Sequence, residues 1–439
     1  MNKRKEVLRS LILLSVPTVI EQIMSTLMQY VDTAMVGHLG EQATAAVSTT
    51  TAVTWLVNCV PLALSKGTLA LLSRANGAGN REQMRRLAGQ SAFLTLTVGT
   101  GLMLLCLILS PFIPVWMGVD EAVQGPAGRY FFIVSLTLVL RTAMYVFGAA
   151  IRSTKNTRLP MRINLASNVL NVILNYILIY AAGLGVSGAA AATAIAYGSA
   201  GLAMTAATYR TESLRWSLKD MKPDPAYLPH FGKISLPALA SSAASCLGYV
   251  FFAGMVAGMG TVTFAAHSIA VNAEELFYVP GYGLRTATSS LIGNALGEGD
   301  RAKLRATEQL SIRITLLMML LSGIILYAAA YPLMHLFTIS EETAQLGAQM
   351  LRLVAFTEPF FGLMVVLEGI FYGKGQTKGV FFIETGSMWG VRILLTFLVV
   401  KVWKLGLRQV WYCMIADNIC KAVMLFLLYR RGRDAEYRV

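Results

Sequence analysis

Long apolar runs with few charges divide almost the whole chain. Segments such as 94–109, 163–182 and 312–330 have the length and composition of bilayer spans, which need about 20 predominantly apolar residues. A backbone that crosses a bilayer must satisfy its hydrogen bonds within the segment. We therefore expect an all-α integral membrane protein with twelve transmembrane helices. The predicted spans are 11–37, 44–72, 88–114, 127–150, 160–182, 187–208, 234–258, 262–290, 307–332, 346–372, 380–401 and 409–429.

Basic residues lie between the apolar segments and not in one basic domain. The formal net charge is +14, but no zinc-finger spacing or aromatic-plus-basic RNA motif accompanies it, so we expect no nucleic-acid partner. Cations gather at both ends of the chain and in every second connection, most of all in 209–233. Because cytoplasmic loops are enriched in Lys and Arg, we expect both termini and this connection in the cytoplasm. Lys401, Lys404 and Arg408 are exceptions to the pattern.

The sequence carries no motif for catalysis or for binding a cofactor. It has no Walker A loop, no dinucleotide fingerprint and no cluster of zinc ligands. Its five cysteines lie in apolar segments without a Cys-x-x-Cys pair, which is typical of small core residues. We expect no enzyme, no metal cofactor and no ATP site, which leaves an ion gradient as the source of energy.

An internal repeat organises the chain. A shift of 220 residues without gaps superimposes Gly77-Ala-Gly79 on Gly297-Glu-Gly299, and it also pairs Pro17 with Pro237. Repeats at a fixed period indicate duplicated structural units. We predict an N-lobe over 1–208, a cytoplasmic linker over 209–233 and a C-lobe over 234–439. With six spans each, the two halves enter from the same side, an arrangement that transporters use to place a substrate site between halves.

Two helices carry polar side chains on one face. Residues at i, i+4, i+7 and i+11 share a helix face, and this spacing relates Glu21, Ser25, Met28 and Asp32 in the first span. The fifth span has the same pattern of asparagines, at Asn164, Asn168, Asn171 and Asn175. A charge inside a membrane is costly and marks a functional site, although Asp32 could also be a neutral packing group. The asparagines could ligate an ion or only join helices through hydrogen bonds.

Several motifs resemble those of the multidrug and toxic compound extrusion (MATE) family of bacterial transporters. They are Val31-Asp-Thr-Ala-Met-Val-Gly-His-Leu-Gly40, Ser73-Arg-Ala-Asn-Gly-Ala-Gly79, Gly293-Asn-Ala-Leu-Gly-Glu-Gly-Asp300, 183–193, 265–270 and 373–377. The resemblance covers nearly the whole chain. It implies two six-helix lobes in a V shape, and efflux of cationic or amphipathic compounds against an inward gradient of H⁺ or Na⁺.

The resemblance also assigns a coupling site to the first half. Related members build a cation site from a helix 1 aspartate, an Asn-x-x-x-Asp pair on helix 5 and a helix 6 threonine. The matching positions here are Asp32, Asn171, Asn175 and Thr193. Asn168 lies on the same helix face as Asn171 and Asn175, and we include it in the predicted coupling site. Asn175 stands where the family pair has its carboxylate, so we expect proton coupling with Na⁺ secondary or absent. Ser245 likewise stands where some members have a helix 7 glutamate.

The second half carries a different set of ionisable residues. Phe252 is the repeat partner of Asp32, so this half lacks the helix 1 carboxylate. Glu274 matches a helix 8 glutamate of several family members, and His267 lies seven residues earlier on the same face. We treat Glu274, Glu275 and His267, together with Glu21 and Met28, as candidates for a substrate site or a second coupling site. Roles for Glu358, Glu368 and Glu384 stay open, and Asp417 and Lys421 are expected to pair.

These features favour a monomeric multidrug antiporter of the bacterial cytoplasmic membrane, with small organic cations as substrates. A flippase of lipid-linked intermediates is the first alternative, because Lys66, Arg141, Arg285 and Arg392 lie in or near spans and could bind pyrophosphate. A receptor or assembly factor that transports nothing is the second. Duplicated halves with carboxylates inside the membrane argue against it.

Overall fold

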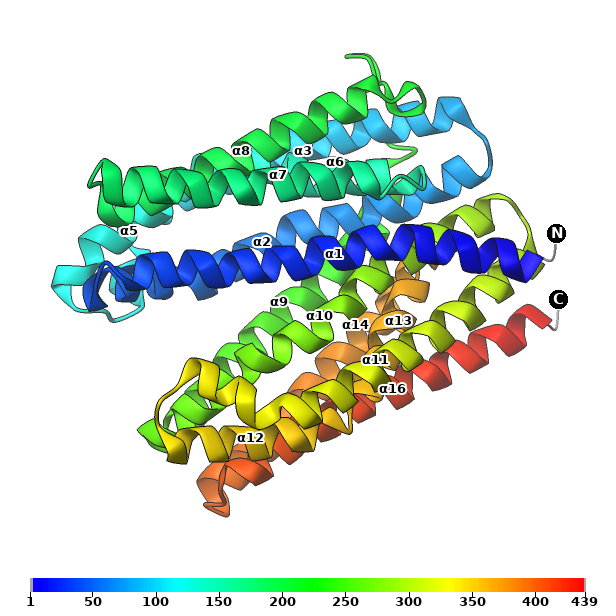
Figure 1. Cartoon of the computed structure of the whole chain (residues 1–439). Helices are drawn as coiled ribbons and strands as arrows, with labels where there is room; N and C mark the ends of the chain where they lie inside the picture. The colour runs from blue at the N-terminus through cyan, green and yellow to red at the C-terminus, as the bar shows by residue number, and fades with distance from the viewer. Residues whose placement is uncertain (1–2, 438–439) are drawn as a thin grey trace. The chain divides into compact units, whose positions relative to one another are not determined.

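The computed structural model describes residues 3–437 as helices joined by short connections, with no strand in that range (Figure 1). The all-α prediction is therefore confirmed. Residues 1–2 and 438–439 lie outside the described part of the chain. The prediction that both termini are cytoplasmic therefore concerns residues that are not described.

The first half contains one helix for each predicted span, with one span broken in two. Its helices are α1 (Lys3–Gly37), α2 (Glu41–Gly77), α3 (Arg81–Leu109), α4 (Ile113–Trp116), α5 (Glu121–Ser135), α6 (Leu138–Ser153), α7 (Arg158–Asn175) with the π-helical turn η1 (Tyr176–Ala181), α8 (Gly185–Arg210) and the short turn η2 (Glu212–Leu214).

The second half repeats this order. Its helices are α9 (Leu228–Ala257), α10 (Thr261–Gly297), α11 (Arg301–Phe337), α12 (Glu341–Ala355), α13 (Glu358–Lys374), α14 (Thr377–Ser387) with η3 (Met388–Ile393), α15 (Leu394–Phe397) with η4 (Leu398–Val402), and α16 (Leu407–Tyr437).

Two predicted spans, 127–150 and 346–372, contain bends that the sequence analysis did not predict. The α5–α6 pair is bent by 48° and the α12–α13 pair by 56°. Both breaks fall at equivalent repeat positions, next to Thr137 and Thr357. Each threonine hydroxyl donates to the carbonyl oxygen three residues earlier, at 3.3 Å and 2.8 Å. Such local bonds compete with the helical ladder and bend helices.

Eleven spans are long and apolar enough to cross a membrane within the described chain, if each bent pair counts as one. The remaining long helix is α10, with 37 residues, which carries Glu274, Glu275 and Arg285 near its middle. Including α10 gives the twelve predicted spans. Its charged side chains are buried within the protein or half-buried, which is how ionisable groups are tolerated in membranes.

The chain divides into two compact units. One unit takes the chain up to Val19, then Ala240–Ile292, and everything from Arg301 on, and the other takes Ile20–Leu239 with Gly293–Asp300. The unit that holds most of the second half has a core around Trp411, Met334 and Leu351. In the unit that holds most of the first half, α6 packs against α2, α3 and α8 (Figure 1).

Close helix packing in the unit that holds most of the first half depends on small residues of α8, a helix rich in Gly and Ala. A Cβ atom at Gly188 would lie 2.6 Å from the carbonyl oxygen of Leu178. One at Gly201 would lie 2.6 Å from the carbonyl carbon of Leu140. Larger side chains at these two positions would push α8 away from η1 and from α6.

The connection between α8 and α9 is held against α3. The buried Gln90 amide donates to the carbonyl oxygens of Asp220 and Lys222, at 2.8 Å and 2.6 Å. Ser217 donates to the Asp220 carboxylate through its backbone N–H and its hydroxyl, at 2.8 Å and 2.7 Å. Burial raises the pKa of Asp220, but the bonds from Ser217 and the nearby Arg85 outweigh it, so this pKa lies below its ordinary value. The predicted linker is thus an ordered segment.

The repeat produces a reciprocal contact between the ends of α2 and α10. A Cβ atom at Gly77 would lie 2.7 Å from the carbonyl carbon of Asn294, and one at Gly297 would lie 2.9 Å from that of Arg74. Arg74 and Asn294 are themselves 220 residues apart, so the two contacts are repeat copies of each other. Asn76 adds a hydrogen bond to the Asn294 side chain at 2.6 Å. These glycines allow the two backbones to touch.

Replacing either glycine should therefore force the helix ends apart. We expect Gly77→Ala and Gly297→Ala each to destabilise the protein by about 1–3 kcal/mol, the usual cost of overpacking. Gly254→Ala is the matched control, because nothing lies within 4 Å of a Cβ there and alanine is the better helix former. Thermal unfolding in detergent measures the difference, and equal melting temperatures for all three variants would contradict this account.

Candidate functional site

Helices α1 and α7 are joined by a ladder of polar side chains. The Asn164 amide donates to Glu21, Asn168 donates to Ser25 at 3.3 Å, and Asn175 donates to Asp32. Each pair is separated by 143 residues in the sequence. A constant separation means that the two helices run in the same direction in register. The faces predicted from the sequence spacing therefore face each other, rung by rung.

Asp32 is surrounded by amides and hydroxyls. Asn175 Nδ2 donates to Asp32 Oδ1. When the Asn171 amide is turned so that its nitrogen faces the carboxylate, it donates to Asp32 Oδ1 at 3.2 Å and accepts from the Thr193 backbone N–H at 3.3 Å. Asp32, Asn171, Asn175 and Thr193 thus come together. Within residues 3–437, Asp32 forms no ion pair, so no fixed cation holds it in the charged form.

Glu21 has the opposite environment. Arg152 on α6 pairs with its carboxylate at 2.5 Å, and both side chains are largely buried. Asn164 donates to the same Glu21 oxygen. A buried ion pair of this kind is costly to break, because removing either partner leaves an uncompensated buried charge. Of the two carboxyl groups on this face of α1, Glu21 has a fixed cationic partner, and Asp32 has none among the described residues.

A pocket of about 200 Å³ connects the two carboxylates. Ser25, Met28 and Gln29 line it between Glu21 and Asp32, and Asn168 lines it from α7. The pocket is polar on the α7 side. Helix α6 contributes Met144 and Tyr145 to the lining, and helix α8 contributes Thr193 and Tyr197.

Sequence reasoning missed a group of aromatic residues beside Asp32. Tyr130 of α5 lies within electrostatic range of Asp32. The buried Arg141 guanidinium lies 4.2 Å from the centre of the Tyr197 ring, and Tyr145 follows one turn later on α6. The four-residue spacing from Arg141 to Tyr145, and from Thr193 to Tyr197, was the available signal. It shows which side chains share a face but not that the faces of α6 and α8 meet.

The groups around Asp32 can be compared as partners for a metal ion and for a proton. One carboxylate with amide and hydroxyl oxygens could hold Na⁺, and Asn175 Oδ1 is buried without a hydrogen-bond partner. However, the Asn175 NH₂ group points at the carboxylate, and its hydrogens would repel a cation. An amide can donate to a carboxylate through nitrogen or accept from a carboxylic acid through oxygen. Asn175 can therefore satisfy both protonation states of Asp32 by turning over.

The candidate residues of the second half lie in the other unit. Glu274 is buried within electrostatic range of Arg392 and of Glu358. His267 is buried with Nδ1 unpartnered, and its ring packs edge-on against Phe252 and Trp411. Glu275 is only half-buried. None of the three is among the residues that line the Asp32 pocket.

The other charged groups of the second half are neutralised in pairs. Asp417 pairs with Lys421 at 2.8 Å, as predicted, and with Arg392 at 2.9 Å. Arg285 pairs with Glu368 at 2.6 Å.

A rung equivalent to that of Glu21 and Asn164 also exists in the second half. There the Ser241 hydroxyl on α9 donates to Glu384 on α14, again 143 residues apart. Both halves therefore have a hydrogen bond at this position, but the carboxylate lies on α1 in the first half and on α14 in the second.

Duplicated spans and a polar site inside one half define a multi-pass membrane transporter. The family model described as MatE matches residues 17–177 and 237–398. The two matched segments begin 220 residues apart, which is the repeat register found in the sequence. The chain belongs to the MatE family of multidrug efflux transporters, and the resemblance seen in its motifs is confirmed.

Individual relatives are similar over nearly their full length. A probable multidrug resistance protein, NorM of Thermotoga maritima, is 27% identical over 433 residues, covering 98% of this chain and 93% of the relative. A variant of the Vibrio cholerae MATE transporter VcmN has the same fold, with a TM-score of 0.92, 22% identity and 99% of each chain covered. A MOP superfamily transporter of Pyrococcus furiosus gives 0.91 and 24%, with 98% of this chain and 96% of its own covered.

Proposed function

We propose that this protein is an antiporter that exports cationic or amphipathic compounds across the bacterial cytoplasmic membrane in exchange for protons. The observation that carries the proposal is Asp32, a carboxyl group inside a membrane span that is bonded by amides and, within the described residues, paired with no cation. Ionisable groups in this setting mark proton pathways. We further propose that the protein works as a monomer without a cofactor.

Coupling follows from the two bonding patterns open to Asn175. A proton that reaches Asp32 removes its charge and requires the neighbouring amide to accept instead of donate. This change alters the contact between α1 and α7. It shifts the equilibrium between transporter conformations only to the extent that they differ in affinity for the proton. Proton and substrate need not share one site, because linkage between separate sites is reciprocal.

The charges of the pocket support cationic substrates. Asp32 is an acidic group on its wall with no cation partner among the described residues, whereas Glu21 is already paired with Arg152, and Met28 and the tyrosines supply adaptable apolar contacts. The alternative of a pyrophosphate flippase needs buried cations that are free to bind an anion. Arg285 and Arg392 are instead paired with carboxylates, and Arg141 lies against tyrosines. Glu274, Glu275 and His267 are left as candidates for a second proton site in the other half.

The central test removes the charge of Asp32. We expect Asp32→Asn to reduce gradient-driven uptake of a fluorescent cation into inverted vesicles to the background of empty vesicles, because asparagine cannot exchange a proton. Folding should survive, since asparagine matches the protonated acid in size and charge. Asp120→Asn is the matched control, because Asp120 is exposed at the start of α5. Wild-type rates in the Asp32→Asn variant at equal protein levels would remove Asp32 from the mechanism.

Ion selectivity is tested at Asn175. In the native protein we expect transport with an imposed pH gradient and none with a Na⁺ gradient at clamped pH and voltage. Asn175→Asp should add a Na⁺-driven component, because a second carboxylate replaces the amide hydrogens with a ligand oxygen. The two carboxylates would also hold a shared proton more tightly, which moves the pH optimum upward. Na⁺-driven transport by the native protein would overturn this assignment.

Orientation in the membrane is tested in the connection between α8 and α9. The positive-inside pattern supports a cytoplasmic position for this segment and for both termini. Ser217 bonds with Asp220, whereas the neighbouring Leu218 is 85% exposed and can be replaced without breaking that bond. We expect Leu218→Cys, in a background without native cysteines, to react with an impermeant reagent only after the cells are opened. Labelling in intact cells would reverse the proposed topology.

A further inference from the structure

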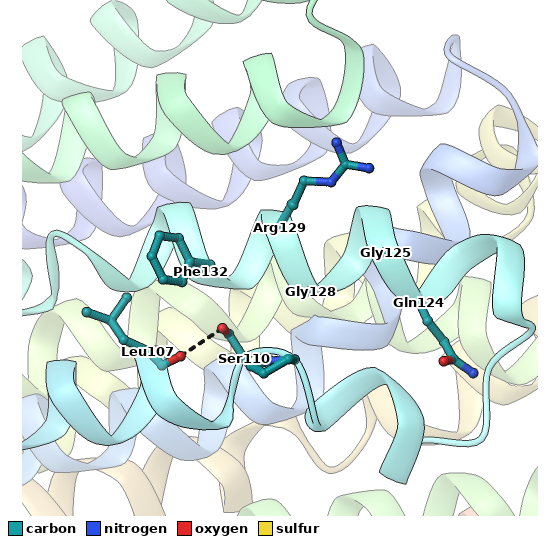
Figure 2. Close-up of a pocket in the computed structure, with 8 residues that line it drawn as sticks. Leu107, Ser110, Gln124, Gly125, Gly128, Arg129 and Phe132 are labelled. Carbon is teal, nitrogen blue, oxygen red and sulfur yellow. Dashed lines mark hydrogen bonds between the residues drawn. The ribbon is translucent and has the colours of Figure 1, made fainter.

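A second hollow lies beside the C-terminal end of α3. The end of α3 and the face of α5 enclose a groove of about 550 Å³. Figure 2 shows Leu107 and Ser110 on the α3 side and Gly125, Gly128 and Arg129 on α5. None of these residues belongs to the Asp32 site. The groove thus needs an explanation of its own.

Two glycines of α5, Gly125 and Gly128, account for the shape of the groove. Gly128 packs tightly against α3, since a Cβ atom there would lie 3.2 Å from the Ser110 carbonyl oxygen. One turn earlier, a Cβ atom at Gly125 would meet only the Arg129 guanidinium, at 3.9 Å. The helices therefore touch at Gly128 and leave space at Gly125. Small residues in membrane helices usually allow close helix contact, but Gly125 faces no helix.

Arg129 is the charged group of the groove. It lies within the apolar α5–α6 span, is exposed, and forms no ion pair or hydrogen bond with the described residues. No dashed line reaches it in Figure 2. Helical side chains point back toward the N-terminus, and its guanidinium accordingly lies over Gly125. Long basic side chains in spans reach for the headgroup level in this way.

The surroundings of the groove indicate a lipid-facing surface. Neighbouring residues of α3, Leu104, Leu105 and Ile108, are each more than half exposed. Beyond them, Phe112 and Trp116 stack with ring centres 6.1 Å apart, and Trp116 is exposed. Aromatic residues of this kind mark the boundary between membrane and water. An unpaired cation just inside that boundary, beside an apolar wall, is complementary to an anionic headgroup with an acyl chain.

We propose that this groove binds one phospholipid. Its phosphate accepts hydrogen bonds from the Arg129 guanidinium, and one acyl chain lies along Leu107 and Phe132. Guanidinium matches phosphate through two parallel hydrogen bonds. The apolar wall favours a lipid over a free phosphate ion, because the polar side chains Ser110 and Gln124 that also line the groove already donate to the carbonyl oxygens of Leu107 and Val119. Bound lipid fills the space that Gly125 leaves and supports the bend between α5 and α6.

The test measures lipid retention by native mass spectrometry of the full-length protein, titrated with dioleoyl phosphatidylglycerol in detergent. We expect one tightly held lipid in the native protein. Arg129→Gln should weaken its binding about tenfold or more, since a charge-assisted hydrogen bond is lost, and Arg129→Lys should restore part of it. Gly125→Leu should abolish binding by filling the groove. Gly101→Leu is the matched control, because Gly101 on α3 also has open space around it but does not line the groove.

Two further titrations identify the source of the phosphate. Dioleoylglycerol, which has the chains without the phosphate, should not be retained, and inorganic phosphate should neither bind nor raise the melting temperature. Stabilisation by inorganic phosphate alone would overturn the lipid assignment in favour of an anion site. Native affinity for phosphatidylglycerol in both Arg129→Gln and Gly125→Leu would overturn the site itself.

Discussion

Polar groups inside a bilayer have no water to bond with, and the first half of this protein is arranged around that constraint. The side chains of Glu21, Ser25 and Asp32 would each be costly to bury alone. Helix α7 supplies an asparagine opposite each of them, in one register. The same hydrogen bonds that make burial tolerable also join α1 to α7, so the structural requirement and the candidate coupling site cannot be separated.

The asparagine at position 175 determines how Asp32 is hydrogen-bonded. An aspartate there would place two like charges together unless a metal ion or a proton lay between them. The amide avoids that conflict and offers a donor or an acceptor as Asp32 changes state. Glu21 shows the contrast, since it forms an ion pair with Arg152. Two carboxyl groups on one helix face are thereby given different roles by their partners alone.

Spacing along the chain predicted much of this arrangement. A regular pattern in the sequence revealed the polar faces of α1 and α7, the twelve spans and the 220-residue repeat. Such patterns can be recognised in one sequence without a structure. Partners that come from non-periodic positions were not predictable in the same way. Arg152 lies at the end of α6, and its position in the sequence does not indicate that it pairs with Glu21, 131 residues away. Tyr130 lies near Asp32 and Tyr197 on a helix that is bent by 48° from α6, and residue spacing does not predict such a bend.

The in-register ladder also restricts how this gene can change. Exchanging one side chain of a rung disturbs that rung and leaves the others in place. Inserting or deleting one residue between Glu21 and Asp32 would instead rotate everything beyond it by about 100°, the angle between successive residues of an α-helix. Asp32 would then leave Asn175 while Glu21 kept Asn164. The eleven-residue interval between the two carboxylates is therefore fixed in length, even where the residues within it are free to vary.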